Sequence, residues 1–359
     1  MCQINVGKNE ATGIPSEVLE SFLKQVLLRE GVGRFDASAV SQGLLDASLR
    51  GVDSHGIRLF AHYLAAVRGG RVNPRPAFSL QCTKSGTGVL DADHGFGHAA
   101  GKKAVEHVKE LATINGIGAV SVKNSTHFGA AAYFGNEIAR SDMLGLCFTN
   151  SDPLIPPTGS SEPFLGNNPI CFTAPILGED PFCLDMATSQ ITFNEVLRLR
   201  ASGESAPAGA GYDQCGYETV DPKKIVSLAP VGGYKGYGLS LMVEILCSLL
   251  AQMPYGPNVG HMYNDTLEKR RHLSHFFLAV DIGSFLDIEK FKTHIAALAG
   301  DLRNQIPVDS NAPIQIAGDP EKLCREQRLA YGIPISEVEV ELFDQLSDLY
   351  GISWRESSD

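Results

Sequence analysis

The sequence predicts a mixed α/β fold that opens with helices. Residues 16–68 carry apolar side chains at helical spacing, and glycines stand where each apolar pattern stops. From residue 77 on, strand-like apolar runs alternate with helical stretches that are flanked by glycine. Of the 359 residues, 43% are hydrophobic and 20% charged. This composition is that of a globular protein with two or three domains, and it excludes collagen-like, coiled-coil and disordered chains.

The first three helices are predicted from apolar residues that recur on one face. The first begins at Ser16 and ends at Gly31, and the second reaches Leu49. A third is expected to begin near Ser54 and to end at Gly69. A polar junction therefore separates the second helix from the third.

The rest of the chain alternates between strands and helices. The predicted strands are 87–91, 117–122, 144–149, 170–174 and 275–281. The predicted helices are 99–114, 130–140, 237–253 and 288–302, and a Ser336-x-x-Glu339 capping box begins another in the tail. The stretch 237–253 is the longest apolar one, but polar residues interrupt it. It is too short and too polar to span a membrane, and a buried helix is the preferred interpretation.

Charge and cysteine usage narrow the possible functions. The chain has 30 Lys and Arg residues against 41 Asp and Glu, a net charge of −11, and no basic cluster of the kind that nucleic-acid binders present. None of the eight cysteines forms a CxxC pair, and no metal-ligand set of Cys and His occurs. The N-terminal residues lack the apolar core of a signal peptide. We therefore expect a soluble, cytoplasmic protein that binds neither metal, nucleic acid nor membrane.

Two histidines stand in polar surroundings that suit acid–base chemistry. His55 follows Ser54 at an expected helix start, where free N–H groups, the hydroxyl and Arg58 could hold a carboxylate. His127 stands between a strand and a helix, where ligands bind in α/β folds. An imidazole with a pKa of about 6.5 can protonate a forming alkoxide. A helix cap and a surface histidine are equally good interpretations of these positions.

Glycine-rich and polar segments recur at the expected strand ends. The glycines Gly95, Gly97 and Gly101 have the spacing of a dinucleotide-binding loop, but the next strand ends in Lys123 and Asn124, without the acidic residue that such a site needs. Close helix packing is therefore the preferred interpretation of these glycines. Further polar clusters occur at 149–153, 165–169, 184–189 and 232–238. Together with the two histidines, they suggest a large polar ligand that crosses several loops.

As an ordered set, these motifs resemble the malate/L-lactate dehydrogenase family of NAD(P)-dependent oxidoreductases, which lacks a Rossmann fold. The resemblance runs from about residue 14 to 350. It rests on GVDSHG, GIGAVSVKNSTHFGAAAYF, NSDPLIPPTG, LGNNP, LDMATS, GGYKGYGL and the late GIP. It implies an α/β fold with a helical portion built from both chain ends, and a homodimer with the active site near the interface.

The family also implies a division of the chain. A helical segment on the substrate side is expected at residues 1–78, followed by an α/β cofactor-binding region at 79–300. A C-terminal helical segment, 301–359, is expected to pack on the first. Within the middle region, Gly203–Pro222 is rich in turn residues and is expected to be a surface excursion.

The resemblance assigns roles to individual residues. It implies acid–base and substrate roles for His127 and His55, with Asp152 beside them, and substrate contacts for Ser54 and Tyr63. The implied cofactor contacts are Ser151, Asp185, Met186, Ala187, Lys235 and Asp281. Several relatives carry a substrate arginine where this chain has Leu59. We expect Arg58 to take its place.

The expected reaction is hydride transfer between NAD or NADP and a small 2-hydroxy/2-oxo acid. A cyclic ketimine carboxylate (piperideine- or pyrroline-2-carboxylate) is the alternative substrate, because a protonated imine needs no strong acid. Asn167 and the segment 190–195 depart from the motifs of many relatives. These departures motivate an alternative of another class, a catalytically silent ligand-binding protein. The choice of proton donor between the two histidines stays open.

Overall fold

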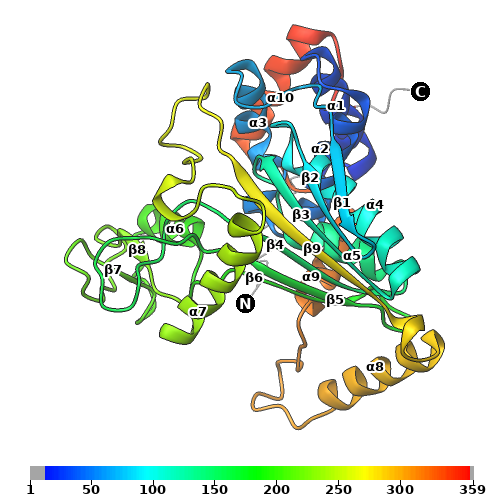
Figure 1. Ribbon diagram of the computed structural model, residues 1–359. Coiled ribbons are helices and arrows are strands. Elements are labelled where there is room, and N and C mark those ends of the chain that lie inside the picture. The colour runs from blue at the N-terminus through cyan, green and yellow to red at the C-terminus, as the bar shows by residue number, and fades with distance from the viewer. Residues whose placement is uncertain (1–12, 356–359) are drawn as a thin grey trace.

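A seven-stranded mixed sheet forms the centre of the computed structural model, which describes residues 13–355 (Figure 1). Its strands lie in the order β1-β2-β3-β9-β4-β5-β6. They are β1 (Ser79–Lys84), β2 (Thr87–Asp91), β3 (Ile117–Ser125), β4 (Met143–Thr149), β5 (Ile170–Ala174), β6 (Phe182–Met186) and β9 (Leu273–Asp281). The five strands expected from the sequence are confirmed. The sequence pattern does not predict β1, because its side chains are largely exposed and do not alternate.

The strand β9 lies between β3 and β4 and runs antiparallel to both. Because of this direction, the beginning of β9 lies beside the carboxyl ends of β3 and β4. His275 is opposite Thr149, whereas Asp281 is opposite Met143 at the other edge of the sheet. The carboxyl ends of β3 and β4 and the start of β9 therefore lie side by side at the same end of the strands.

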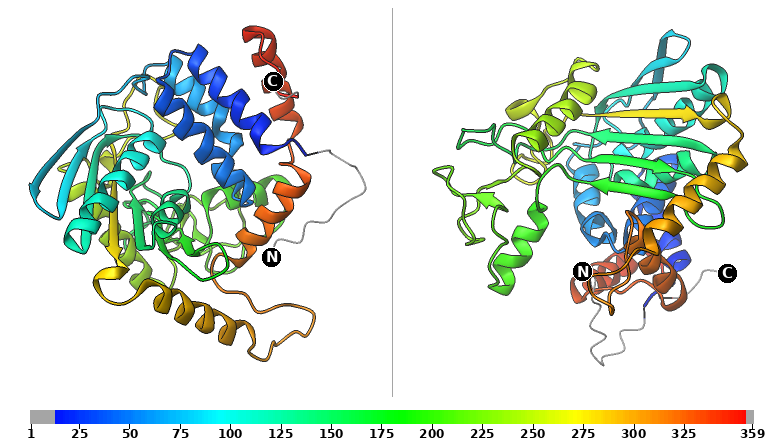
Figure 2. Two further views of the ribbon diagram at one scale, coloured as in Figure 1. Left: turned by 90° about the vertical axis from the view of Figure 1, so that its right-hand side faces the viewer. Right: turned by 90° about the horizontal axis from the view of Figure 1, so that it is seen from below.

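Helices cover both faces of the sheet (Figures 1 and 2). The long ones are α1 (Ser16–Arg29), α2 (Arg34–Leu49), α3 (Phe60–Arg68), α4 (Gly97–Asn115), α5 (Ala131–Ala139), α6 (Phe193–Ser202), α7 (Tyr234–Glu244), α8 (Ile288–Arg303), α9 (Asp319–Tyr331) and α10 (Glu337–Tyr350). Helices α4 and α5 pack on Phe277, and α7 with the following turn packs on Phe276. Adjacent strand residues point to opposite faces, so these helices enclose the sheet from two sides. Within residues 13–355, no helix is long and apolar enough to cross a membrane.

Helices from both chain ends share one core. Phe343 of α10 packs against Phe22 of α1 at 5.2 Å between ring centroids, and against Phe60 of α3 at 6.4 Å. Trp354 closes the cluster. The expected α/β class with a helical portion built from both ends is confirmed, and the Ser336–Glu339 capping box is present at the start of α10. The proposed boundaries at residues 78 and 300 stay a prediction.

A small lobe lies beside the sheet, at the left of Figure 1. It holds α6 and the two-residue strands β7 (Gly211–Tyr212) and β8 (Ser227–Leu228), and its own core includes Val196 and Ile225. Half of the residues in the segment Gly203–Pro222 are exposed on this lobe, and only four are buried.

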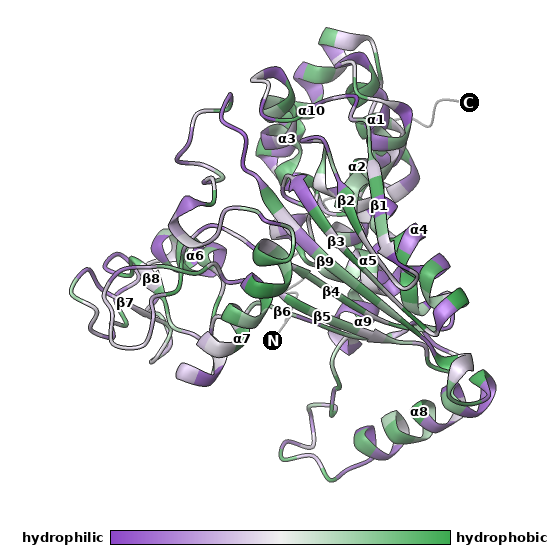
Figure 3. Ribbon diagram, viewed as in Figure 1, coloured by the Kyte–Doolittle hydropathy of each residue, from purple (hydrophilic) through white to green (hydrophobic). Residues whose placement is uncertain are grey.

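The expected buried helix at 237–253 is only partly buried. The helix α7 and a π-helical turn, Ile245–Leu249, cover this stretch. Val243 and Cys247 face the sheet, whereas Leu241, Ile245 and Leu249 are exposed. In Figure 3, much of this segment has the green colour of hydrophobic residues. The prediction of burial on all sides is wrong for a single chain, because no other element of the described chain covers this face.

The glycines of α4 permit close packing, as the sequence suggests. A side chain at Gly101 would meet the ring of Phe134 at 2.4 Å, and one at Gly97 would meet the carbonyl oxygen of Thr126 at 2.3 Å. The start of α4 therefore lies directly against the backbone that precedes His127. These contacts leave no role for a phosphate in explaining the glycine spacing.

The third helix begins later than expected. A 3₁₀ turn, Asp53–His55, and a second one, Ile57–Leu59, precede α3. Gly56 between them is extended, and a side chain there would come within 2.1 Å of the Ser48 hydroxyl of α2. The backbone N–H of Ile57 donates to that hydroxyl at 3.0 Å. Ser54 is therefore not a helix cap, because the junction is held against α2.

Candidate active site

Two histidine rings from distant parts of the chain lie face to face. His55 comes from the 3₁₀ turn after α2, and His127 follows the carboxyl end of β3. Their ring centroids are 5.5 Å apart, and the ring planes differ by 29°. Both line a cavity of about 370 Å³. Its further lining includes Arg50, Ser54, Gly129, Ala130, Ala131, Thr149, Asn150, Ser151, Asn167, Asp185, Ala187, Thr192, Gly318 and Glu321.

Each ring has a hydroxyl partner at Nδ1. The Tyr63 hydroxyl lies 2.7 Å from Nδ1 of His127, and the Ser54 hydroxyl lies 2.9 Å from Nδ1 of His55. Burial raises the pKa of Tyr63, which is only 3% exposed, so its phenol stays protonated. The two Nδ1 atoms are thus occupied, and Nε2 is the nitrogen left on each ring.

Both imidazoles are held neutral by their surroundings. Burial lowers the pKa of His55. Burial also holds the pKa of His127 well below its usual range, and the positive charges of nearby groups, among them Arg271, add to this effect. At neutral pH, the site therefore presents imidazole and not imidazolium.

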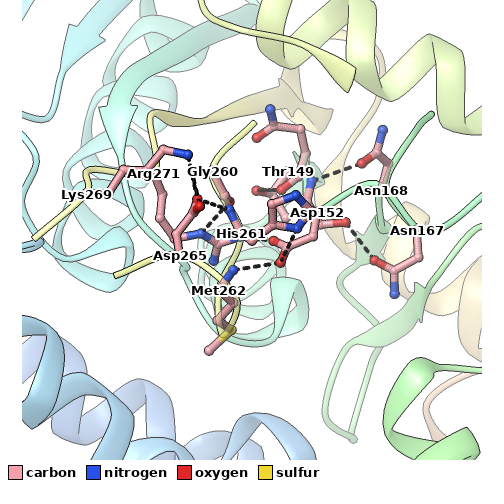
Figure 4. Close-up of polar contacts among 12 residues, drawn as sticks. Thr149, Asp152, Asn167, Asn168, Gly260, His261, Met262, Asp265, Lys269 and Arg271 are labelled. Atoms are coloured by element: carbon pink, nitrogen blue, oxygen red, sulfur yellow. Dashed lines mark hydrogen bonds and ion pairs between the residues drawn. The ribbon is translucent and has the colours of Figure 1, made fainter. Parts of the chain in front are cut away.

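Asp152 pairs with an arginine and not with either of these imidazoles. Its carboxylate forms an ion pair with Arg271 and accepts a hydrogen bond from the backbone N–H of Met262 at 2.7 Å (Figure 4). Its nearest histidine contact is His261, at 3.9 Å. Arg271 is only 3% exposed, and its charge contributes to the lowered pKa of His127. Within residues 13–355, Asp152 makes no hydrogen bond or ion pair with His55 or His127, and the expected role in orienting or charge-stabilising an imidazolium stays a prediction.

A third histidine, His275, joins the strand ends that carry the site. Its Nδ1 lies 2.8 Å from the Thr149 hydroxyl at the end of β4, and its Nε2 lies 2.8 Å from the Ser125 hydroxyl at the end of β3. The ring stacks on Phe128 at 4.6 Å. Burial lowers the pKa of His275 to about 3, so the ring is neutral and can donate to one hydroxyl while it accepts from the other.

Ser151 is positioned by two neighbouring asparagines. Its hydroxyl donates to the side-chain oxygen of Asn167 at 2.7 Å, and its backbone N–H donates to that of Asn168 at 3.0 Å. The Asn168 amide in turn donates to the buried carboxyl group of Glu244 at 2.7 Å. The departure from the family motif at Asn167 thus supplies a direct partner for Ser151.

The end of β6 contributes the expected acidic residue. The carboxylate of Asp185 accepts a hydrogen bond from the N–H of Ala132, in the first turn of α5, at 2.8 Å. Asp185 and Ala187 line the cavity, and Met186 lies between them in the chain. These residues are therefore close to the histidines, as expected.

Three of the expected site residues lie elsewhere. Arg58 is 61% exposed, and its closest carboxylate is Glu339 of α10, at 3.7 Å. Lys235 is exposed at the start of α7. Asp281 binds Ser284 at the opposite edge of the sheet, because β9 is antiparallel to its neighbours. None of the three lines the cavity.

Sequence reasoning also missed residues that the structure places at the cavity. Arg50 stands four positions before Ser54, and the loop around Gly318 brings Glu321 to the same wall. The neighbouring Ser54-His55-Gly56 motif could have indicated that Arg50 lies near the site. No local pattern marks the loop, because its approach depends on the packing of α9.

Replacement of Asn168 by leucine is expected to lower the free energy of unfolding by about 2–3 kcal/mol, because a buried carboxyl group loses its amide donor. Chemical denaturation followed by circular dichroism measures the change. Asn311→Leu, at an exposed position, is the control and should stay within about 0.5 kcal/mol of the wild type. Equal stability of the Asn168 variant and the control would contradict this role.

The chain resembles known proteins along nearly its whole length. The sequence profile of the malate/L-lactate dehydrogenases matches residues 14–343. A malate dehydrogenase from Pyrococcus abyssi is 35% identical over 353 residues, which cover 96% of each chain. The crystal structure of malate dehydrogenase from Entamoeba histolytica matches with a TM-score of 0.89 at 30% identity, and covers 95% of this chain and 98% of that one.

A relative with a different named substrate has the same fold. The Δ1-piperideine-2-carboxylate reductase from Pseudomonas syringae pvar. tomato matches with a TM-score of 0.83 at 26% identity. The match covers 93% of this chain and 99% of that chain. With the stacked histidines at the cavity, the extent of these matches leads to one conclusion: the chain belongs to the malate/L-lactate dehydrogenase family.

Proposed function

We propose that this protein is an NAD(P)-dependent oxidoreductase that transfers hydride between a nicotinamide cofactor and a small 2-hydroxy/2-oxo acid. The observation that carries the proposal is the stacked pair His55 and His127 at the cavity, with Nδ1 of each ring held by a hydroxyl. Membership of the family supports the reaction class.

The cavity is proposed to receive the nicotinamide cofactor. Its volume of about 370 Å³ lies within the range of small-molecule sites. Two charged groups on its wall have hydrogen-bonding capacity to spare: Asp185, with one carboxylate oxygen bonded, and Arg50, whose Nε and Nη1 have no acceptor among the described residues. We propose Ser151, Asp185 and Ala187 as cofactor contacts. When bound, the nicotinamide ring supplies or accepts the hydride.

His127 is the proposed proton carrier. Tyr63 holds its Nδ1, so Nε2 is free for the substrate oxygen. The neutral imidazole accepts the hydroxyl proton as a 2-hydroxy acid is oxidised, and in the reverse direction the same nitrogen returns the proton to the oxygen. His55 stacks on this ring and completes the polar wall.

The substrate carboxylate is proposed to bind near Ser54. Its hydroxyl is at the cavity beside His55. Arg58 does not supply the positive charge from its exposed position against Glu339. The buried Arg271, held by Asp152, supplies a positive field on the His127 side. Asp152 is therefore a positioning residue in this proposal.

A cyclic ketimine carboxylate is the second candidate substrate. The piperideine-2-carboxylate reductase relative supports it, and so does the lowered pKa of both imidazoles. A neutral imidazole is a weak acid, but a substrate imine that arrives protonated does not need one.

The activity test follows absorbance at 340 nm with NADH or NADPH, against 2-oxo acids and the two cyclic imine carboxylates. Turnover is expected with the wild type, and ketone reduction should be lost in His55→Ala/His127→Ala. His107→Ala, on α4 outside the cavity, is the matched control. Full activity of the double variant would contradict the mechanism. Binding of a nucleotide without turnover of any substrate would favour the silent ligand-binding alternative.

The pH dependence should differ between the two directions. Because the pKa of His127 is lowered, the base form prevails above about pH 6.5, and kcat/KM for oxidation should be flat through neutral pH. The acid form becomes scarcer as pH rises, so kcat/KM for ketone reduction should fall by up to about tenfold per pH unit. Initial rates in both directions from about pH 6 to 8 measure this. A reduction rate that is flat across neutral pH would exclude His127 as the titrating donor.

A cytoplasmic homodimer is the proposed state of the protein. The seven cysteines of the described chain are free thiols, as is usual in a reducing compartment. The exposed face of α7 and the π-helical turn carries Leu241, Ile245 and Leu249, four positions apart. An apolar stripe of this kind suits a second copy of the chain.

Light scattering on the eluting protein tests the homodimer. The wild type should elute as a dimer, and Leu249→Glu should yield a monomer, because a charge would be buried at the interface. Ile114→Glu, at an exposed apolar position at the end of α4, is the control and should remain dimeric. If Leu249→Glu is still a dimer, the interface lies on another face of the protein. A monomeric wild type would refute the proposed homodimer.

A further inference from the structure

Arg50 is a buried cation without a hydrogen-bond partner. Its side chain is 7% exposed, and neither Nε nor Nη1 has an acceptor within residues 13–355. The nearest carboxylate oxygen, on Asp46, is 3.8 Å away, beyond hydrogen-bond distance. A buried guanidinium with unused donors is costly in free energy. This cost points to a ligand that accepts from Arg50.

Arg50 lies where the cavity is continuous with a smaller one. Arg50, Cys183, Gly318 and Glu321 line both the main cavity and an adjoining space of about 20 Å³. The loop at Gly318 follows a left-handed turn, with φ of +95°, that presses it against Cys183. The guanidinium therefore stands at the wall of a preformed space.

Further donors line the same cavity. Ala130 and Ala131 belong to the start of α5 and line the main cavity. The structure provides no acceptor for their N–H groups among the described residues, whereas the next N–H, of Ala132, donates to Asp185. Free N–H groups at the start of a helix favour an anion. Together with Arg50, they make the cavity suited to a negatively charged group.

Different charged groups act on Arg50 and on the two imidazoles. The charged groups that act on Arg50 are Asp46 and Asp185, whereas those that act on His127 are other histidines and Arg271. Burial alone accounts for the lowered pKa of His55, without a contribution from Arg50.

Two carboxylates beside Arg50 narrow the choice of anion. Asp185 and Glu321 line the same wall, and they would repel a bare carboxylate or an inorganic anion. In a dinucleotide, however, each phosphoryl group is flanked by a ribose, whose hydroxyls donate to carboxylates. The mixture of one guanidinium and two carboxylates therefore matches a ribose phosphate.

We propose that Arg50 binds a phosphoryl group of the nicotinamide dinucleotide, with Asp185 and Glu321 as acceptors for the adjoining ribose hydroxyls. This assignment rests on the proposed function, since it takes the dinucleotide as the ligand of the cavity. It makes Arg50 a cofactor-binding residue in place of the exposed Lys235.

Direct binding to the protein without substrate tests the proposal. Titration calorimetry gives Kd for NADH, NADPH and reduced nicotinamide riboside, which has no phosphate, with the wild type, Arg50→Met and Arg50→Lys. Arg50→Met should weaken binding of a dinucleotide about ten- to hundredfold, as expected for a lost charged hydrogen bond. Arg50→Lys should weaken it less, and binding of the riboside should not change. Arg58→Met is the control, because it removes an exposed cation close in sequence.

Each contrary result has a distinct meaning. Unchanged NADH and NADPH affinity in Arg50→Met, or an equal loss for the riboside, overturns the assignment. A raised KM for the 2-oxo acid with unchanged dinucleotide affinity would assign Arg50 to the substrate carboxylate instead. If the methionine variant does not fold by circular dichroism, the lysine variant decides by the same comparison. Failure of the wild type to bind either dinucleotide would refute the proposed function itself.

Discussion

The bridge made by His275 is the interaction on which the geometry of the site depends. One neutral ring, buried in β9, joins the hydroxyls at the ends of β3 and β4. The residues just beyond those hydroxyls are His127 on one side and Ser151 on the other. Because β9 enters between the two strands in the reverse direction, a single side chain can hold both loops at once. A protonated ring could not accept a hydrogen bond from either hydroxyl, so the bridge depends on the low pKa of His275.

Charged side chains and the two neutral imidazoles occupy different parts of the site. The ion pair of Asp152 and Arg271 lies outside the cavity lining, while the facing imidazoles at the cavity are neutral. Burial lowers the pKa of His127, and the charges of nearby groups, among them Arg271, act in the same direction. A substrate that brings its own negative charge would oppose these charges and raise the pKa of the ring. Substrate binding and proton transfer are therefore coupled through electrostatics and need no movement of the fold.

Local patterns predicted much of this molecule, and topology accounts for what they missed. Five of the seven strands of the central sheet and the polar positions of the two histidines could be predicted, because each depends on neighbouring residues. Asp281 lies at the far end of the strands because β9 is antiparallel to its neighbours, and this direction cannot be read from its own residues. Arg58 lies outside the cavity lining, because the chain around it forms 3₁₀ turns against α2 where a helix was expected. The roles expected for both residues stay predictions. Arg50 was missed because the cavity beside it forms only when the loop at Gly318 arrives from a remote part of the chain.

The two facing rings are carried by different cores. His55 is anchored through Leu49 and Ile57 to the helical core that both chain ends build, whereas His127 is anchored through Val122 and Phe128 to the core of the sheet. The pair exists only while one core is docked on the other. Loss of activity during gentle heating or mild denaturant would therefore report the separation of these two bodies, before either has lost its secondary structure. Activity would thus be lost when the two cores separate, before the protein unfolds globally.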